Sequence, residues 1–174
     1  SIDEEQNIFL DKIKGNTKVT CLSNQDCTIL QKKYKNIKKV IIGDGKNTML
    51  KNNSFDIVHS NATIEHLGSF EEQVLFVKEM FRISKESIFI QTPNRFYPID
   101  FHTILPFVHW LPKKIHRKIL KYLKLDFYAE EKNLNLLDIR ELKKICEMLK
   151  ITKFKILKYK LFFFTSNLIL VAYK

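Results

Sequence analysis

Two neighbouring stretches of the sequence decide the fold: Val40-Ile-Ile-Gly43-Asp44-Gly45 and Ser54-Phe-Asp-Ile-Val-His-Ser-Asn-Ala-Thr-Ile-Glu-His-Leu-Gly68. Each begins as a short apolar run and ends in small and polar residues. In an open α/β sheet, ligands bind outside the carboxyl ends of the strands. We therefore interpret both stretches as strands that end at a ligand site.

The first half of the sequence alternates predicted strands with predicted helices. Strands are expected at 18–22, 40–42, 55–59 and 87–91, because these segments are apolar and rich in β-branched residues. Helices are expected over 28–34 and, after a capping box formed by Ser69 and Glu72, over 70–81. This alternation predicts an α/β fold with a Rossmann-like, doubly wound and mostly parallel sheet.

The second half predicts a lid and an antiparallel edge. Residues 93–136 are aromatic and interrupted by prolines, so we expect a lid inserted into a single domain that covers residues 1–174. Helices are expected over 113–123 and after a capping box at Asp138 and Glu141. Strands at 154–159 and 167–173, joined by a turn at 165–167, predict an antiparallel pair.

Composition sets the class of protein. The formal charge of +11 would suit nucleic acid or an anionic membrane, but the lysines are scattered, which favours a solvated surface. The three cysteines contain no C-x-x-C pair, so neither a disulfide framework nor a zinc site is expected. No apolar run approaches the roughly 20 residues that span a bilayer. We expect a soluble, cytoplasmic protein.

These segments resemble the class I S-adenosylmethionine-dependent methyltransferases, in their small-molecule branch. The resemblance rests on Asp44 in Ile-Ile-Gly-Asp-Gly, on Phe55-Asp-Ile-Val58 and on Glu65-His-Leu67, which occur in the family's order and spacing. It implies that S-adenosyl-L-methionine is the cofactor. In the family, the residue at the position of Asp44 accepts a hydrogen bond from the adenine amino group.

The resemblance also implies the remaining cofactor-binding residues. Gly43 and Gly45 flank Asp44, and glycine lets the backbone approach an aromatic ring closely. The loop that contains Ser60, Asn61 and Ala62 would lie along the methionine part of the cofactor. The acidic residue that usually holds the ribose would be replaced by one of two residues that come slightly later in the sequence, Gln25 or Asp26. Asp26 could equally cap the following helix.

One part of the family pattern is missing from the sequence. The sequence contains no counterpart of the family's glycine-rich loop, because its four glycines, Gly15, Gly43, Gly45 and Gly68, form no such motif. It also contains no clear counterpart of the family's first strand, which comes before that loop. Ser1-Ile-Asp-Glu4 resembles a capping box, with a helix expected through Ile13. We therefore expect a fragment that begins just after the missing loop.

Histidines and aromatic residues supply the candidates for chemistry. His66 could take a proton from an acceptor hydroxyl, or it could, with Glu65, only brace the loop. His102, His109 and His116 recur every seven residues, but the prolines between them break any helix that would align them, so no metal site is expected. Tyr97, His102 and Trp110 are candidate substrate-binding residues, with lid packing as the alternative.

Three functions follow from these residues. The first is methyl transfer from S-adenosyl-L-methionine to a small molecule or to a cell-envelope glycan, because similar bacterial sequences suggest polysaccharide biosynthesis. The second is a catalytically inactive, methyltransferase-like binding or scaffold domain that lacks the cofactor loop. Methylation of nucleic-acid bases is disfavoured, because Ser60-Asn-Ala-Thr63 stands where an Asn/Asp-Pro-Pro-aromatic motif would hold a flipped base, but methylation of an RNA ribose stays open. The basic segment 113–118 could rest on an anionic membrane.

Overall fold

The computed structural model describes residues 8–13 and 17–174. The chain forms two compact units, one of residues 1–49 and one of residues 50–174. The predicted capping box at Ser1 and Glu4 lies outside the described residues.

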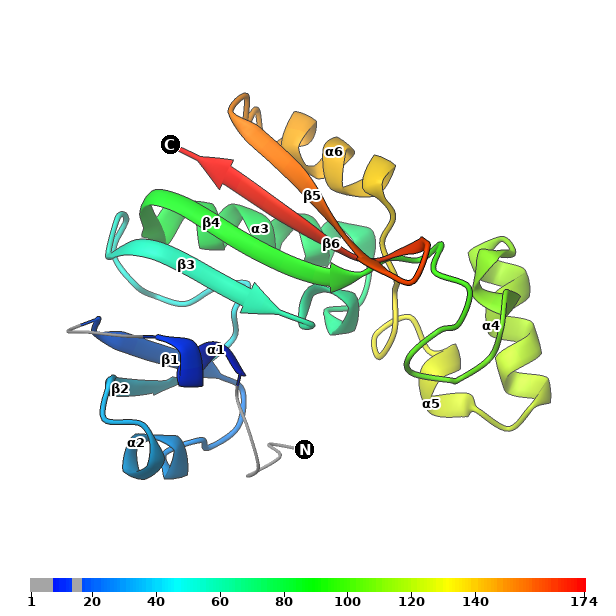
Figure 1. The fold of residues 1–174 in the computed structure, drawn as a ribbon, viewed down its shortest axis with the longest axis horizontal. Coiled ribbons are helices and arrows are strands. Elements are labelled where there is room, and N and C mark those ends of the chain that lie inside the picture. The colour runs from blue at the N-terminus through cyan, green and yellow to red at the C-terminus, as the bar shows by residue number, and fades with distance from the viewer. Residues whose placement is uncertain (1–7, 14–16) are drawn as a thin grey trace. The chain divides into compact units, whose positions relative to one another are not determined.

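The N-terminal unit is built around two parallel strands (Figure 1). β1 (Val19–Ser23) pairs with β2 (Ile37–Ile42), and α2 (Ile29–Lys33) lies in the crossover that joins them, as parallel pairing requires. α1 (Ile8–Lys12) precedes the two strands. The backbone N–H of Gly43 donates to the carbonyl of Ser23 at 2.9 Å, so β1 and β2 end side by side. Asp44 therefore follows the carboxyl end of β2, as predicted.

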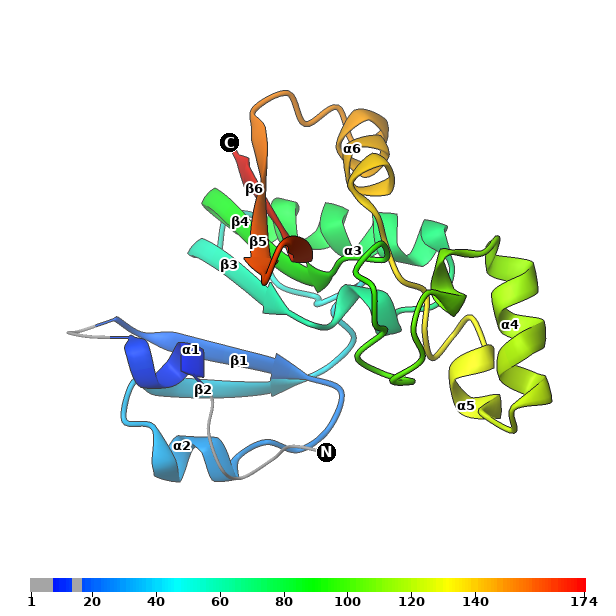
Figure 2. The same cartoon turned by 45° about the vertical axis from the view of Figure 1, so that its right-hand side comes forward.

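The C-terminal unit contains a four-stranded sheet in the order β3-β4-β6-β5 (Figure 2). β3 (Phe55–Asn61) and β4 (Ser84–Pro93) pair in parallel. β6 (Phe164–Tyr173) pairs antiparallel with both β4 and β5 (Phe154–Leu161). The predicted α/β class and the predicted antiparallel C-terminal pair are confirmed.

Two helices share one hydrophobic core with this sheet. α3 (Phe70–Ile83) and α6 (Ile139–Met148) both begin at the predicted capping boxes, in which the side chain of Ser69 or Asp138 accepts from the N–H three residues later. Each box satisfies helix N–H groups that have no partner within the helix. The core that the helices and strands build is fully or almost fully buried and includes Val77, Met80, Ile88, Ile90, Leu142, Ile145, Leu168 and Leu170.

Gly68 fixes how the chain enters α3. Its φ of +91° lies in the region that only glycine adopts without strain. A Cβ atom at this position would collide with the carboxylate of Glu72, which closes the capping box. The glycine that precedes Ser69 is therefore required by the cap.

The hairpin between β5 and β6 turns earlier than predicted. The turn is Phe162-Phe163, with Leu161 paired to Phe164, so the expected turn at 165–167 is wrong. Thr165 and Ser166 are instead part of β6, in which Thr165 pairs with Lys160 of β5. Their carbonyl groups also accept hydrogen bonds from the side chain and the backbone of Asn94. The polar character of Thr165 and Ser166 is typical of a turn, but in this fold these residues bind Asn94 in the segment that follows β4.

The segment between β4 and α6 is folded into short helices. It contains η2 (Val108–Trp110), α4 (Lys113–Tyr122) and α5 (Asp126–Ala129), while η1 (Ile64–His66) follows β3. The helix expected over 113–123 is confirmed as α4. In the part of the chain that the structure describes, no helix combines the length and the apolar character needed to cross a membrane.

Candidate functional site

A polar cluster lies beyond the carboxyl end of β3. The strand ends at Asn61, and Ala62 then turns the chain with a φ of 48°, a left-handed conformation that is uncommon for alanine. The N–H of Ala62 donates to the carbonyl of Gln91 on the neighbouring β4 at 3.0 Å. This turn leads directly into η1, which carries Glu65 and His66.

Glu65 is the buried member of the cluster. Its side chain is fully buried, and one carboxylate oxygen, Oε2, accepts a hydrogen bond from the hydroxyl of Thr92 at 2.9 Å. The other oxygen, Oε1, is buried with no hydrogen-bond partner among the described residues. Burial raises the pKa of Glu65, while the nearby His66 and His102 oppose that rise. A buried carboxylate with a free oxygen is costly unless another group approaches it.

His66 and His102 face each other across the cluster. Their rings meet edge to face, with centroids 4.9 Å apart, and their Nε2 atoms are 3.2 Å apart. The Nδ1 atom of His66 lies 2.7 Å from the carbonyl of Asn133, so that nitrogen must donate. The Nδ1 atom of His102 lies 3.1 Å from Oδ1 of Asp100 and donates to that carboxylate.

Asp100 holds His102 in this orientation. Burial raises its pKa, but hydrogen bonds from His102 and from the hydroxyl of Thr103 outweigh this effect and lower the pKa to about 2. The carboxylate is therefore ionised and accepts from the His102 ring. In the neutral rings of both histidines, Nε2 then carries a lone pair rather than a proton.

Ser60 lies one step back along β3, at the position expected to line the methionine part of a cofactor. Its hydroxyl is buried and has no hydrogen-bond partner among the described residues. Asn61 and Ala62 follow it and are exposed. An orphaned hydroxyl beside exposed backbone at the carboxyl end of a strand fits a polar ligand group there.

Asp44 occupies the corresponding position in the N-terminal unit. Its carboxylate accepts from the backbone N–H of Lys46 at 2.9 Å, which is the local turn considered as its alternative role. The side chain nevertheless stays 54% exposed, with Lys46 Nζ at 3.8 Å, so the carboxylate can still accept another hydrogen bond. Gly43 leaves open backbone beside it, since a Cβ there would make only ordinary contact with Leu22.

Asp26 makes a local turn contact just before α2, whose N-cap residue is Thr28 and not Asp26. Its carboxylate accepts from the backbone N–H of Thr28 at 2.9 Å, immediately before α2, and this hydrogen bond lowers its pKa. Gln25 is exposed, and its N–H donates to the hydroxyl of Ser23. Both residues follow the carboxyl end of β1, where the sequence places the ribose contact.

The three residues predicted to contact substrate are divided between two places. His102 belongs to the cluster with His66, whereas Tyr97 and Trp110 meet elsewhere, where the carbonyl of Tyr97 accepts from Trp110 Nε1 and from His109 Nε2. Tyr97 is buried and stacks on Phe101, which fits lid packing. Trp110 keeps an exposed surface.

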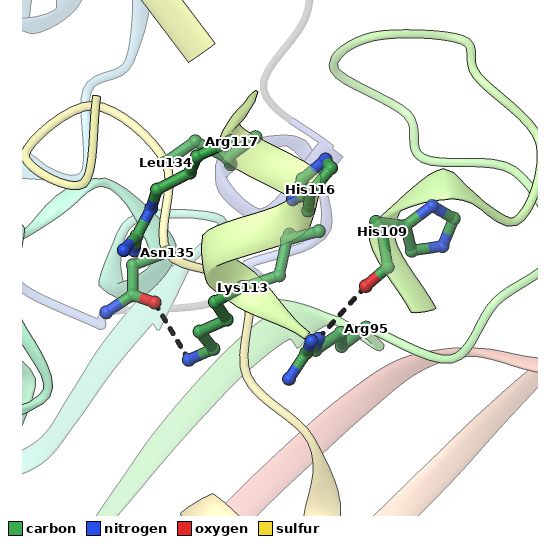
Figure 3. Close-up of a pocket in the computed structure, with 8 residues that line it drawn as sticks. Arg95, His109, Lys113, His116, Arg117, Leu134 and Asn135 are labelled. Carbon is green, nitrogen blue, oxygen red and sulfur yellow. Dashed lines mark hydrogen bonds between the residues drawn. The ribbon is translucent and has the colours of Figure 1, made fainter. Parts of the chain in front are cut away.

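A small basic pocket lies beside α4 (Figure 3). In it, Lys113 donates to the side chains of Asn135 and Glu141, and Arg95 donates to the carbonyls of His109 and Leu111. The pocket is lined by Arg95, His109, Lys113, His116, Arg117, Leu134, Asn135 and Leu136. Arg117 also pairs with Glu131, so two of the four cations in 113–118 have acidic partners. This pairing favours a solvated surface for that segment.

Because His116 is buried in this pocket, we expect the free energy of unfolding to fall in mild acid. Burial lowers its pKa to about 4, with His109, Arg95 and Arg117 adding to the effect, and its buried Nε2 has no partner among the described residues. Because the folded pKa lies below the ordinary value near 6.5, stability is complete above that value and falls as pH drops toward 4. From about pH 7.5 to about pH 5, we expect a loss of roughly 1 to 2 kcal/mol, measured by urea unfolding.

The matched variant for this prediction is His116→Gln, which keeps a polar side chain but cannot take up a proton. It should flatten the dependence of the free energy of unfolding on pH, leaving a smaller slope from His109, whose pKa is lowered in the same direction. If His116→Gln loses as much stability in acid as the natural chain does, another group is responsible.

The cluster includes residues that the sequence did not single out. Three residues from separate segments orient the side chains of the cluster. Thr92 contacts Glu65, Asp100 contacts His102, and Asn133 contacts His66. The only local signal is the spacing Asp100-x-His102, in which the aspartate also accepts from the His102 backbone N–H at 3.0 Å. An aspartate two residues before a histidine is too common to identify a site.

Comparison with known proteins shows which domain and which fold the chain resembles. Residues 8–89 match the family model described as a methyltransferase domain. A comparison with curated protein sequences found no match. The solved structures that share the fold include proteins from Archaeoglobus fulgidus, Methanosarcina mazei and Nostoc punctiforme. The first two are S-adenosylmethionine-dependent methyltransferases and the third is a putative O-methyltransferase.

The extent of these similarities differs among the three structures. The Archaeoglobus protein is 15% identical with a TM-score of 0.56, and the match covers 95% of this chain and 90% of that one. The Methanosarcina protein is 12% identical with a TM-score of 0.58 and coverages of 91% and 82%. The Nostoc protein is 12% identical with a TM-score of 0.54, and the match covers 90% of this chain but only 44% of that protein.

The N-terminal half of the chain thus matches a methyltransferase domain, and the chain shares its fold with S-adenosylmethionine-dependent methyltransferases. S-adenosyl-L-methionine is the cofactor that the domain match and these neighbours imply. Within the C-terminal unit, the orphaned hydroxyl of Ser60 fits a polar group of this cofactor. Within the N-terminal unit, the exposed carboxylate of Asp44 can accept a hydrogen bond from an amino group.

Proposed function

We propose that this chain forms part of an enzyme that transfers a methyl group from S-adenosyl-L-methionine to a small molecule or to a cell-envelope glycan in the cytoplasm. The observation that carries the proposal is the polar cluster after β3, which lies directly beyond the strand end where Ser60 offers an unpaired hydroxyl. The choice of a glycan as the acceptor rests on the family resemblance alone.

Different residues of the chain would contact different parts of the cofactor. Asp44, between Gly43 and Gly45, would accept from the adenine amino group, and Gln25 or Asp26 would contact the ribose. Ser60, Asn61 and Ala62 would line the methionine part. When bound, the cofactor supplies an electrophilic methyl group on a sulfonium. Such a transfer depends above all on alignment of the acceptor.

His66 is the residue proposed to meet the acceptor. Its ring is exposed, and Nδ1 is fixed by the carbonyl of Asn133, so Nε2 presents a lone pair. That nitrogen can accept a hydrogen bond, and then the proton, from an acceptor hydroxyl. His102 and Trp110 remain the candidate contacts for the rest of the acceptor, because both keep accessible surface.

The test is calorimetric titration with S-adenosylhomocysteine, using the protein expressed from its full reading frame. We expect binding in the micromolar range. Adenosine monophosphate, which lacks the homocysteine part, serves as the control ligand and should bind more weakly. Absence of S-adenosylhomocysteine binding would favour the alternative, an inactive methyltransferase-like scaffold. If binding is found, transfer of a labelled methyl group to sugars and small hydroxylated compounds identifies the acceptor class.

A further inference from the structure

The contact between His66 and His102 is incomplete as it stands. Both Nδ1 atoms are committed as donors, to Asn133 and to Asp100, so both Nε2 atoms of the neutral rings carry lone pairs. Two lone pairs at 3.2 Å repel each other unless a positive species lies between them. The arrangement therefore calls for a proton or a metal cation.

Glu65 brings a third donor to the same point. Its carboxylate and the two imidazoles each offer a ligand atom within 4.8 Å of the other two. The side chain is fully buried, and its Oε1 atom has no hydrogen-bond partner among the described residues. A proton shared between the two histidines would leave this oxygen unsatisfied, whereas a cation bound by all three residues would satisfy it.

We propose that Glu65, His66 and His102 bind one divalent transition-metal ion, of which Zn²⁺ is the representative. Two imidazole nitrogens and one carboxylate oxygen form the ligand set of catalytic zinc sites, which keep a further position open. Ligands bound at about 2.1 Å lie roughly 3.4 Å apart in a tetrahedral site, close to the observed Nε2–Nε2 separation of 3.2 Å. This assignment replaces the expectation that the chain has no metal site.

The surroundings of the three ligands also suit a cation. Each ligand is oriented by a second group, since Thr92 donates to Glu65, His66 donates to the Asn133 carbonyl and His102 donates to Asp100. Metal-binding histidines almost always donate their other ring nitrogen to a carbonyl or a carboxylate. The two buried carboxylates, Glu65 and Asp100, would also balance the charge of a divalent ion.

A cation here would change the role of His66 in the proposed function. It would occupy the Nε2 lone pair, so that an acceptor hydroxyl would bind at the open position of the metal and lose its proton there to solvent. This second step rests on the proposed methyl transfer. The binding of the cation itself does not, and it can be measured without cofactor or acceptor.

The experiment is a titration of tag-free, chelator-treated protein with Zn²⁺ by calorimetry and with Co²⁺ by visible absorption. We expect one equivalent to bind in the micromolar range or tighter, with absorption bands typical of low-coordinate Co²⁺. Glu65→Gln and His102→Asn should each weaken binding at least tenfold, and Asp100→Asn should weaken it about tenfold through the orientation of His102. Circular dichroism confirms that each variant is folded.

Two control variants separate this site from other donors. His59→Asn removes a histidine from β3 outside the cluster, and Cys21→Ser removes a thiol from the N-terminal unit. Both should bind Zn²⁺ like the natural chain. The proposal is overturned if neither metal binds at millimolar concentration, if His102→Asn and Glu65→Gln bind as tightly as the natural chain, or if either control abolishes binding. A chain that binds Zn²⁺ but not S-adenosylhomocysteine would refute the proposed function and leave the metal site standing.

Discussion

Replacement of Ile90 by alanine is expected to lower the free energy of unfolding of the C-terminal unit by about 3 to 4 kcal/mol. Ile90 is fully buried on β4, between Ser60 of β3 and Leu170 of β6, which stand opposite it in the sheet. Its truncation removes buried methyl groups and leaves a cavity that the neighbouring strands and α3 cannot close. The expected loss of stability is large because Ser60 and Leu170 are held in register by the sheet and cannot move into the cavity.

Urea unfolding followed by tryptophan fluorescence measures this effect. Trp110 is the only tryptophan in the sequence and belongs to the C-terminal unit, so the signal reports that unit. Ile90→Val should lose only about 0.5 to 1.5 kcal/mol. The matched control is Ile57→Ala on β3, whose side chain is 55% exposed and whose truncation should cost less than about 1 kcal/mol. Equal losses at positions 57 and 90 would show that Ile90 is not in the core.

The parts of the fold that depend on local signals could be predicted from the sequence. Both capping boxes were predicted because a serine or aspartate three residues before a glutamate can satisfy helix N–H groups without help from distant residues. The strand that ends at Asn61 was predicted for a similar reason, because its apolar run and the polar turn after it are contiguous. The β5–β6 turn was misplaced, since it consists of two phenylalanines, which are not typical turn residues.

The composition of the polar cluster could not be predicted from local signals. His102 was grouped with His109 and His116 by their regular spacing, whereas the fold pairs it with His66, 36 residues away. His109 lies instead against Tyr97. Glu65 and His66 are adjacent in the sequence, which predicts only that they brace the loop together. Only the tertiary structure shows that the carboxylate of Glu65 is buried with a free oxygen.

The substitution with the largest expected effect on cofactor binding is Asp44→Ala. We expect it to weaken the affinity for S-adenosylhomocysteine ten- to a hundredfold, because a hydrogen bond to a charged group contributes about 1.5 to 3 kcal/mol and 1.4 kcal/mol corresponds to a tenfold change. The carboxylate can accept this bond, because its side chain is 54% exposed while it contacts the backbone N–H and the ammonium of Lys46. Calorimetry on the protein from the full reading frame measures the affinity.

Two further variants show whether the loss comes from the lost contact or from the turn. Asp44→Asn keeps an oxygen that can accept from the Lys46 N–H and from adenine but removes the charge, so it should bind more tightly than Asp44→Ala and less tightly than the natural chain. Asp56→Ala removes an exposed carboxylate at the start of β3, where it pairs with Lys85 at 2.8 Å, and should leave the affinity unchanged. If Asp44→Ala binds like the natural chain, or if Asp56→Ala weakens binding equally, Asp44 does not contact the adenine, and the cofactor is held by other residues.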